Sequence, residues 1–191
     1  ESYSLFAQYA EGYRPPNFNE SNQAFANLAY QYAVVPNPDI QAETSKSFEF
    51  GLRADYENAY LSVSAFRNSY KDFISSNYIG RSGAVSLYQN QNIDDVEIHG
   101  AEATAFLYIG ENWRMRSSIA YAMGRDRETS QHLDSVDPVN LVNSLRYDST
   151  SGKWGAELFW TVVADKTKVS SDSVTGADGY QVLDAVMDLR I

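Results

Sequence analysis

The sequence predicts an all-β chain that forms an antiparallel, meandering transmembrane β-barrel, with about eight strands in its 191 residues. Three observations predict this fold class. Apolar and polar residues alternate with period 2 in segment after segment, and no stripe with a period of 3.6 residues is sustained. Short and long connections between these segments alternate along the chain. Aromatic residues gather beside the short connections.

Composition excludes several other classes of protein. Twenty-five acidic residues against fifteen basic ones give a net charge of -10, which argues against a nucleic-acid partner because phosphate binding requires clustered cations. The chain has no cysteine, so a disulfide framework, a zinc–thiolate site and a thiol nucleophile are excluded. Charged residues interrupt every apolar run before the ~18 residues that a membrane helix needs.

Each expected strand is as long as the roughly 9–11 residues that a tilted strand needs to cross a membrane. In chain order the expected strands cover residues 1–13, 44–56, 59–72, 92–109, 112–124, 139–148, 153–165 and 180–191. The whole of 1–191 is therefore interpreted as a single barrel segment.

The alternation places charge on only one face of these strands. Within 44–56, Phe50 and Leu52 share one face while Glu49 and Arg53 share the other, and the strands 112–124 and 153–165 are divided in the same way. A charge that faces lipid at mid-membrane costs about 2–4 kcal/mol, so the charged face should line the lumen. The expected lumen-facing residues are Glu49, Arg53, Glu102, Arg114, Arg116, Arg146, Glu157 and Asp184.

The lengths of the connections set the orientation of the barrel. Short turns are expected at 56–59, 109–112 and 150–153, and they all fall on one side of the sheet. Transmembrane barrels have short periplasmic turns and longer extracellular loops. A soluble β domain, the alternative, has no reason to keep this asymmetry. The expected extracellular loops are 14–43, 73–91, 125–138 and 166–179.

Aromatic residues within a few positions of the short turns predict an interfacial girdle. The alternative is that strands are simply rich in tyrosine and tryptophan. The expected girdle residues are Tyr56, Tyr60, Tyr108, Trp113, Tyr147 and Trp154.

Several collinear runs carry a family resemblance. The first long loop holds Tyr-Arg-Pro-Pro at 13–16 and Asn-Pro-Asp-Ile at 37–40, and Ala-Glu-Thr-Ser at 42–45 and Glu-Phe-Gly-Leu-Arg at 49–53 follow. With the run from His99 to Ala103, they resemble the barrel of TonB-dependent outer-membrane receptors, in particular the haemoglobin, haem and transferrin receptor branch. The sequence departs from that pattern at Ala42, where proline is commonest, and at His99, where arginine is usual.

The resemblance implies a barrel of 22 strands around a plug, of which this chain would be the C-terminal part, with the plug domain and the remaining strands absent. It implies a multi-pass receptor of the Gram-negative outer membrane that takes up haem or iron from haemoglobin or another haemoprotein. The TonB–ExbB–ExbD complex would energise uptake through the plug, and outer-membrane lipid and lipopolysaccharide would surround the barrel. Haem would be transported rather than permanently bound.

Two alternatives remain open at this point. One is a receptor for a siderophore or another metallophore, and the other is a standalone eight-stranded barrel with an adhesive or structural role. No nucleophile-elbow spacing, Gly-x-Gly or P-loop occurs in the chain, so no enzymatic activity is expected.

The resemblance also directs attention to the first long loop. Haem-receptor relatives keep an axial histidine between the two boxes, and this sequence has none there, so the candidate haem ligands are Tyr30, Tyr32 and the distant His132. The alternative is that all three are ordinary loop residues. The expected ligand- or partner-binding residues are Tyr13, Arg14, Pro15, Pro16, Phe25, Tyr30, Tyr32, Asn37, Pro38 and Asp39.

Acidic residues at Asp94, Asp95 and Glu97, and at Asp172 and Asp178, have the chemistry to bind calcium, but neither group has EF-hand spacing. Solvated loops explain both groups equally well. The sequence therefore predicts no metal site.

Overall fold

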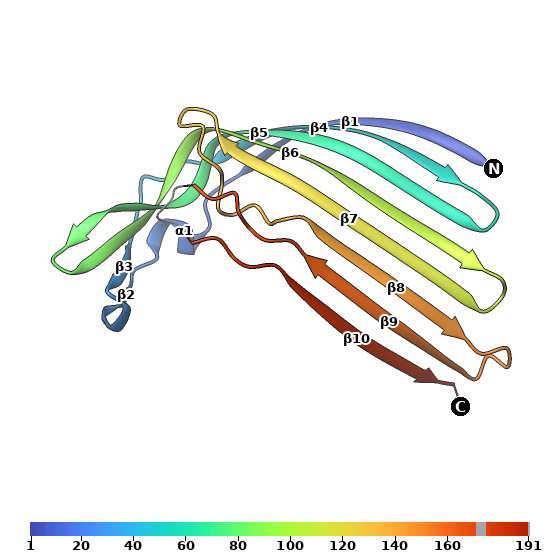
Figure 1. Cartoon of the computed structure of the whole chain (residues 1–191). Coiled ribbons are helices and arrows are strands. Elements are labelled where there is room, and N and C mark those ends of the chain that lie inside the picture. The colour runs from blue at the N-terminus through green and yellow to red at the C-terminus, as the bar shows by residue number, and fades with distance from the viewer. Residues whose placement is uncertain (171–174, 191) are drawn as a thin grey trace.

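A computed structural model describes residues 1–170 and 175–190, so Asp172 and the last expected strand residue, 191, lie outside the described residues. Eight long strands form one antiparallel sheet, in which each strand pairs with the next along the chain (Figure 1). They are β1 (Ser2–Arg14), β4 (Glu43–Asp55), β5 (Ala59–Ser82), β6 (Val85–Ile109), β7 (Trp113–Asp126), β8 (Asn140–Asp148), β9 (Trp154–Val163) and β10 (Tyr180–Leu189). The predicted all-β meander is confirmed.

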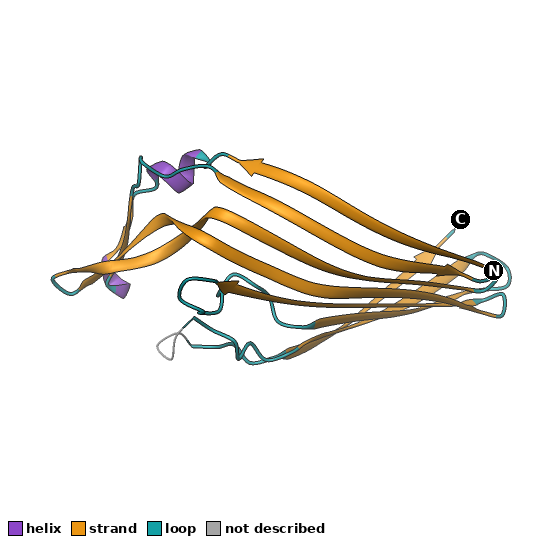
Figure 2. Cartoon of the chain, turned by 90° about the horizontal axis from the view of Figure 1, so that it is seen from above, coloured by secondary structure: helices purple, strands orange, loops and turns teal. Residues whose placement is uncertain are grey.

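The sheet is a strongly curved wall rather than a closed barrel (Figures 1 and 2). Its two edges are β1 and β10, and no ladder between described residues joins them. Short turns connect the strands at one end, and longer segments lie at the other. Within the described part of the chain, no helix is long and apolar enough to cross a membrane.

The prediction of a long loop over 73–91 is wrong, because β5 and β6 continue through it as a hairpin that projects beyond the rest of the sheet (Figure 1). Residues 73–79 are rich in strand formers, and two glycines near the tip serve the hairpin. Gly80 accommodates a register shift after Tyr78, and Gly83 turns the chain with a φ of 61°.

The loop 14–43 is also structured. It contains α1 (Phe18–Asn22), β2 (Phe25–Asn27), a 3-10 helix over Leu28–Tyr30 and β3 (Tyr32–Val35). β3 pairs in parallel with residues 86–89 of β6, and β2 pairs with β3, so the projecting hairpin becomes a small sheet in the order β2-β3-β6-β5. Few apolar side chains in the described residues are buried, and most of those lie at this loop end: Ile40, Ile74, Val96 and Leu133.

The two faces of the large sheet differ in character. Because side chains directly opposite each other share a face, the register places all eight residues expected to line the lumen on one face. The opposite face is apolar and exposed, as expected for a surface that meets lipid. It includes Leu5, Phe50, Leu52, Leu61, Val63, Leu107, Met115, Ile119, Leu145, Leu158 and Leu183.

Gly51 shows why the run Glu-Phe-Gly-Leu-Arg needs its glycine. The ring of Phe6 lies directly against the Gly51 backbone, and the guanidinium of Arg53 stacks 4.5 Å from the centre of that ring. A Cβ atom at residue 51 would overlap the ring and would lie 2.8 Å from the carbonyl oxygen of Val63. The motif therefore encodes an aromatic side chain packed across the neighbouring strand.

We expect Gly51→Val to displace Phe6 and to lower the free energy of unfolding by about 1–3 kcal/mol, the usual cost of overpacking. The measurement is the thermal unfolding of the protein in detergent, followed by its heat-dependent shift in gel mobility. Ser4→Val is the matched control, because Ser4 is exposed on the same face of β1. Equal melting temperatures for the two variants would show that this contact is dispensable.

Candidate ligand-binding site at the loop end

Arg14 gathers three segments at the point where β1 ends. Its Nε and Nη2 donate to the two carboxylate oxygens of Glu43, at 2.6 and 3.0 Å, and its Nη1 donates to both oxygens of Glu20, at 2.8 and 2.9 Å. Glu43 also accepts the backbone N–H of Ile74 at 3.2 Å. One guanidinium thus ties β1 and α1 to the beginning of β4, and Glu43 extends the connection to β5.

The charge state of Glu43 follows from these contacts. Burial of the carboxyl would by itself raise its pKa, but the hydrogen bonds from Arg14 and Ile74 and the positive charge of Arg14 lower the pKa overall. Hydrogen bonds from Glu43 and Glu20 in turn raise the pKa of Arg14. Both shifts favour the charged forms, so Arg14 and Glu43 form an ion pair at neutral pH.

Asn37 fixes the far end of the same loop. Its side-chain amide donates to the carbonyl of Asn90 in β6 at 2.9 Å, and its backbone N–H donates to the carbonyl of Ser21 at 3.0 Å. The amide of Gln89 donates to the carbonyl of Pro36 at 2.8 Å. The Asn-Pro-Asp-Ile run is consequently held against both α1 and β6.

Amide side chains of β6 complete the attachment of the loop. Asn90 donates to the carbonyl of Glu20 at 3.0 Å. Asn92 donates to the carbonyls of Gln41 and Asp72, at 3.0 and 2.7 Å, and its side-chain oxygen accepts the N–H of Gln41 at 2.8 Å. Because these bonds satisfy backbone groups that have no strand partner, they fix the loop in one arrangement.

The projecting sheet presents an aromatic face. Phe25 and Tyr32 lie 5.9 Å apart between ring centres, and Tyr78 and Tyr88 lie 5.8 Å apart. Tyr30, at the end of the 3-10 helix, is 80% exposed beside them. We call this set the aromatic face, and it comprises Phe25, Tyr30, Tyr32, Val34, Tyr78 and Tyr88. A shallow hollow on it is lined by Tyr30, Tyr32, Val34, Tyr88, Ser76 and Ser86.

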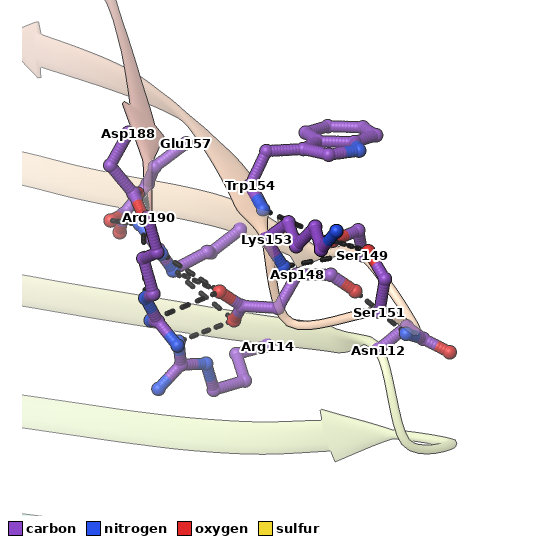
Figure 3. A network of polar contacts seen from close by, with 11 residues as sticks. Asn112, Arg114, Asp148, Ser149, Ser151, Lys153, Trp154, Glu157, Asp188 and Arg190 are labelled. Atoms are coloured by element: carbon purple, nitrogen blue, oxygen red, sulfur yellow. Dashed lines mark hydrogen bonds and ion pairs between the residues drawn. The ribbon is translucent and has the colours of Figure 1, made fainter.

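At the opposite end of the sheet, ion pairs join β7 to β10 across the charged face (Figure 3). Asp148 accepts Nη2 of Arg114 at 2.5 Å and Nη2 of Arg146 at 2.8 Å. Arg146 also donates to Asp188 at 2.7 Å and lies 3.9 Å from Glu157. This network therefore contains three of the residues expected to line the lumen: Arg114, Arg146 and Glu157. It links the four strands β7, β8, β9 and β10 near the short turns.

Comparison with known proteins decides the family. The family described as "TonB dependent receptor-like, beta-barrel" matches residues 1–191, the whole chain. The chain belongs to the TonB-dependent receptor β-barrel family. Members of this family are receptors and transporters rather than enzymes, and in Gram-negative bacteria they are outer-membrane β-barrel proteins. The resemblance found in the sequence motifs is confirmed.

The curated relatives of this receptor barrel are longer proteins. "Hemoglobin and hemoglobin-haptoglobin-binding protein C" of Haemophilus influenzae is 27% identical over 206 residues, which cover 87% of this chain and 19% of the relative. "Hemoglobin-haptoglobin utilization protein B" of Neisseria meningitidis serogroup C is 24% identical over 200 residues, which cover 91% of this chain and 24% of the relative. The chain thus spans about a fifth to a quarter of the length of these proteins.

Solved structures share the fold of this receptor barrel. The copper transporter OprC superposes with a TM-score of 0.81 at 22% identity, over 99% of this chain and 29% of that one. The ferric enterobactin receptor of Pseudomonas aeruginosa superposes with a TM-score of 0.74 at 20% identity, over 100% of this chain and 31% of that one. At these identities the likeness shows that the fold is shared, and nothing more.

The receptor's structure divides the residues predicted for its first loop into separate roles. Arg14 and Asn37 are anchors, with Pro15, Pro16, Pro38 and Asp39 in the connections beside them. Phe25, Tyr30 and Tyr32 belong to the aromatic face. Tyr13 lies at the end of β1 on the face that carries the apolar side chains, away from the aromatic face.

Sequence reasoning missed residues that complete both parts of the receptor's site. Glu20, Glu43, Asn90 and Asn92 supply the partners of the anchors, and Tyr78 and Tyr88 supply two of the six residues of the aromatic face. The run of four amides at 89–92 was a usable signal, since amide side chains can bond a backbone that lies across a strand. The two tyrosines were hidden by the interpretation of 73–91 as a loop.

His132 lies in a different part of the loop end from Tyr30 and Tyr32. It forms a bridge to Arg125 beside the end of β7, and its Nδ1 is buried without a hydrogen-bond partner among the described residues. The remaining residues expected to line the lumen are spread over the charged face. Arg116 packs on the ring of Phe106, Glu49 and Glu102 line one shallow hollow, and Asp184 lies opposite Phe159.

Proposed function

We propose that this chain is part of a TonB-energised receptor in the outer membrane of a Gram-negative bacterium, and that its aromatic face binds an extracellular haemoprotein from which haem or iron is taken up. The observation that carries this proposal is the anchored aromatic face. Exposed aromatic side chains on a rigid support supply binding energy at little entropic cost. The relatives named for hemoglobin and hemoglobin–haptoglobin point to the same class of ligand.

The proposal assigns roles to the remaining predicted partners. A plug and further strands beside β1 and β10 would complete the lumen, whose wall is the charged face. Pulling by the TonB–ExbB–ExbD complex on that plug would open the path for haem. Haem is cargo in this scheme and not a resident cofactor.

Among the candidate haem ligands, Tyr30 is the best placed. A tyrosine phenolate can ligate ferric haem, and the side chain of Tyr30 is exposed at the rim of the hollow. Tyr32 packs against Phe25, and His132 is held beside β7 with Nδ1 buried. We therefore propose Tyr30 as the first residue to contact haem as it leaves the carrier.

The test uses the complete receptor and immobilised haemoglobin. Truncating Tyr30 and Tyr88 together to alanine should weaken binding by about tenfold or more, since each aromatic anchor typically contributes over 1 kcal/mol. Tyr108→Ala is the matched control, because Tyr108 is 52% exposed, between Tyr88 at 37% and Tyr30 at 80%, and lies beside a short turn at the opposite end. Measured dissociation constants for wild type, double variant and control decide the result.

Two outcomes would contradict this proposal. If the wild-type receptor binds no haemoglobin but retains a ferric siderophore, the chain serves a metallophore receptor. If haemoglobin binds with the same affinity after both tyrosines are removed, the docking surface lies elsewhere on the receptor. Tyr30→Phe separates docking from ligation, because it keeps the ring and removes the phenolate.

A further inference from the structure

A band of charge lies on the apolar face of the sheet, directly above its last apolar residues toward the loop end. Strand register places Lys46, Arg67, Lys71, Glu97 and Arg125 on that face. Below them the same face carries apolar side chains across the whole sheet. We call these residues the outer cationic band, and its members are the cations Lys46, Arg67, Lys71, Arg125, Arg127 and Lys168 with the anions Glu11, Asp95 and Glu97.

The centre of the band is a partly neutralised cluster. Glu97 accepts Nη2 of Arg67 at 2.6 Å, and Nη1 of Arg127 lies 3.7 Å from the same carboxylate oxygen. Nδ1 of His99 lies 3.7 Å from its other oxygen. Arg125 is directly opposite Glu97 in the ladder and is exposed. A single carboxylate thus has two guanidinium groups and the His99 ring within 4.0 Å, and Arg125 lies opposite it in the ladder.

The flanks of the band extend it over several strands. Lys46 lies 3.8 Å from Glu11 on the β1 side, and both side chains are exposed. From the connection after β9, Lys168 reaches across to β7, where its Nζ lies 3.4 Å from the Tyr121 hydroxyl and 5.5 Å from the centre of that ring. Six of the chain's fifteen cations therefore lie in the band, although the chain as a whole carries a net charge of -10.

The position of the band decides which ligand it fits. In a barrel of this family the apolar face meets the acyl chains, so a charge immediately above it lies at the level of the headgroups of the outer leaflet. Guanidinium groups bind phosphate through two parallel hydrogen bonds, and this geometry makes arginine the preferred partner of phosphate. A soluble ligand bound in the lumen has no access to this face.

We propose that the outer cationic band binds the phosphate groups of a phosphorylated glycolipid in the outer leaflet, with Arg125 and Arg127 as the principal contacts. Arg67 is largely engaged by Glu97, whereas Arg127 is only loosely paired and Arg125 faces outward beside it. Lipid bound here would bridge β5, β6 and β7 from outside. The proposal rests on the barrel family and not on the haem ligand, so its failure leaves the proposed function untouched.

The test counts lipids retained by the complete receptor in native mass spectrometry. The probes are bis-phosphorylated lipid A, its mono-phosphorylated form and phosphatidylethanolamine. The wild-type receptor should retain them in that order. The double variant Arg125→Gln/Arg127→Gln should lower retention of the bis-phosphorylated lipid by about 10- to 30-fold, given the typical attraction of each interfacial cation to an anionic lipid surface.

The control variant Arg81→Gln/Lys153→Gln removes the same charge from the projecting hairpin and from a short turn. It should change retention by less than about twofold, since headgroup attraction falls off within a Debye length.

A fivefold or greater fall restricted to Arg125→Gln/Arg127→Gln supports the proposal. A smaller fall, an equal fall in the control, or equal retention of phosphatidylethanolamine by wild type would overturn it. Arg125→Lys/Arg127→Lys should recover part of the binding, which distinguishes lost charge from misfolding.

Discussion

A receptor that carries Ile119→Arg is expected not to accumulate in the outer membrane, whereas Ala120→Arg should accumulate nearly as wild type. Ile119 is 44% exposed on the apolar face of β7, opposite Ala103 of β6 and Leu141 of β8. An arginine that faces lipid near the midplane costs about 2–4 kcal/mol, which is a large part of the stability of a typical protein.

Ala120 is the matched control because it is the next residue and points to the other face. It lies opposite Glu102 in β6, so an arginine there would gain a carboxylate neighbour on a polar surface. The measurement is the amount of heat-modifiable receptor in isolated outer membranes. Accumulation of both variants at the wild-type level would show that this part of the apolar face does not meet lipid.

The alternation of apolar and polar residues correctly predicted the features that depend on local sequence, namely the two faces of the sheet and the short turns. The period-2 arrangement of Arg114, Arg116 and their apolar neighbours established which side chains share a face, because a one-residue slip would reverse every assignment. The short turns after β4, β6 and β8 were found for a related reason, since they interrupt the alternation with polar residues. Strand boundaries on this side are therefore close to the expected ones.

The loop end depends on contacts that no local pattern contains. Arg14 and Glu43 are 29 residues apart, and Asn37 reaches the carbonyl of a residue 53 positions later. Such pairs form only when the loop folds back on the hairpin of β5 and β6. The hairpin itself was missed because alternation does not distinguish a strand inside the membrane from its continuation outside it, so the strands were expected to end at residue 72 and to begin again at residue 92.

The loop end also yields the second large effect that we expect. Arg14→Leu should release the first loop, because it removes four hydrogen bonds and leaves the mostly buried carboxylate of Glu43 without a cation. The four hydrogen bonds join charged groups, which raises the cost of losing them, but Arg14 is partly exposed, which lowers that cost. We therefore expect the local stability of the loop to fall by about 1–3 kcal/mol. The measurement is hydrogen exchange of the backbone amides of residues 17–41, which should become faster throughout the segment.

Two further variants locate the cause of that release. Arg14→Lys keeps the charge but cannot bond Glu20 and Glu43 together through a fork, so it should restore only part of the protection. Arg81→Leu removes a cation from the projecting hairpin and should leave exchange of the loop unchanged. Slow exchange in Arg14→Leu would mean that the amide contacts of Asn37 and Asn92 hold the loop without the ion pairs.

The pH dependence of the same exchange tests the electrostatic part of the argument in the unmodified receptor. Because the pKa of Glu43 is lowered in the folded state, its contribution is fully present above the unfolded value of about 4.3 and is lost as the pH falls through the lower, folded value. Loop protection should therefore be constant between pH 7 and pH 5, after correction for the intrinsic exchange rate, and should fall only below about pH 4. Release already between pH 7 and pH 5 would assign the anchor to a group with a higher pKa, and it would show that the pairing of Arg14 with Glu43 does not hold the aromatic face in place.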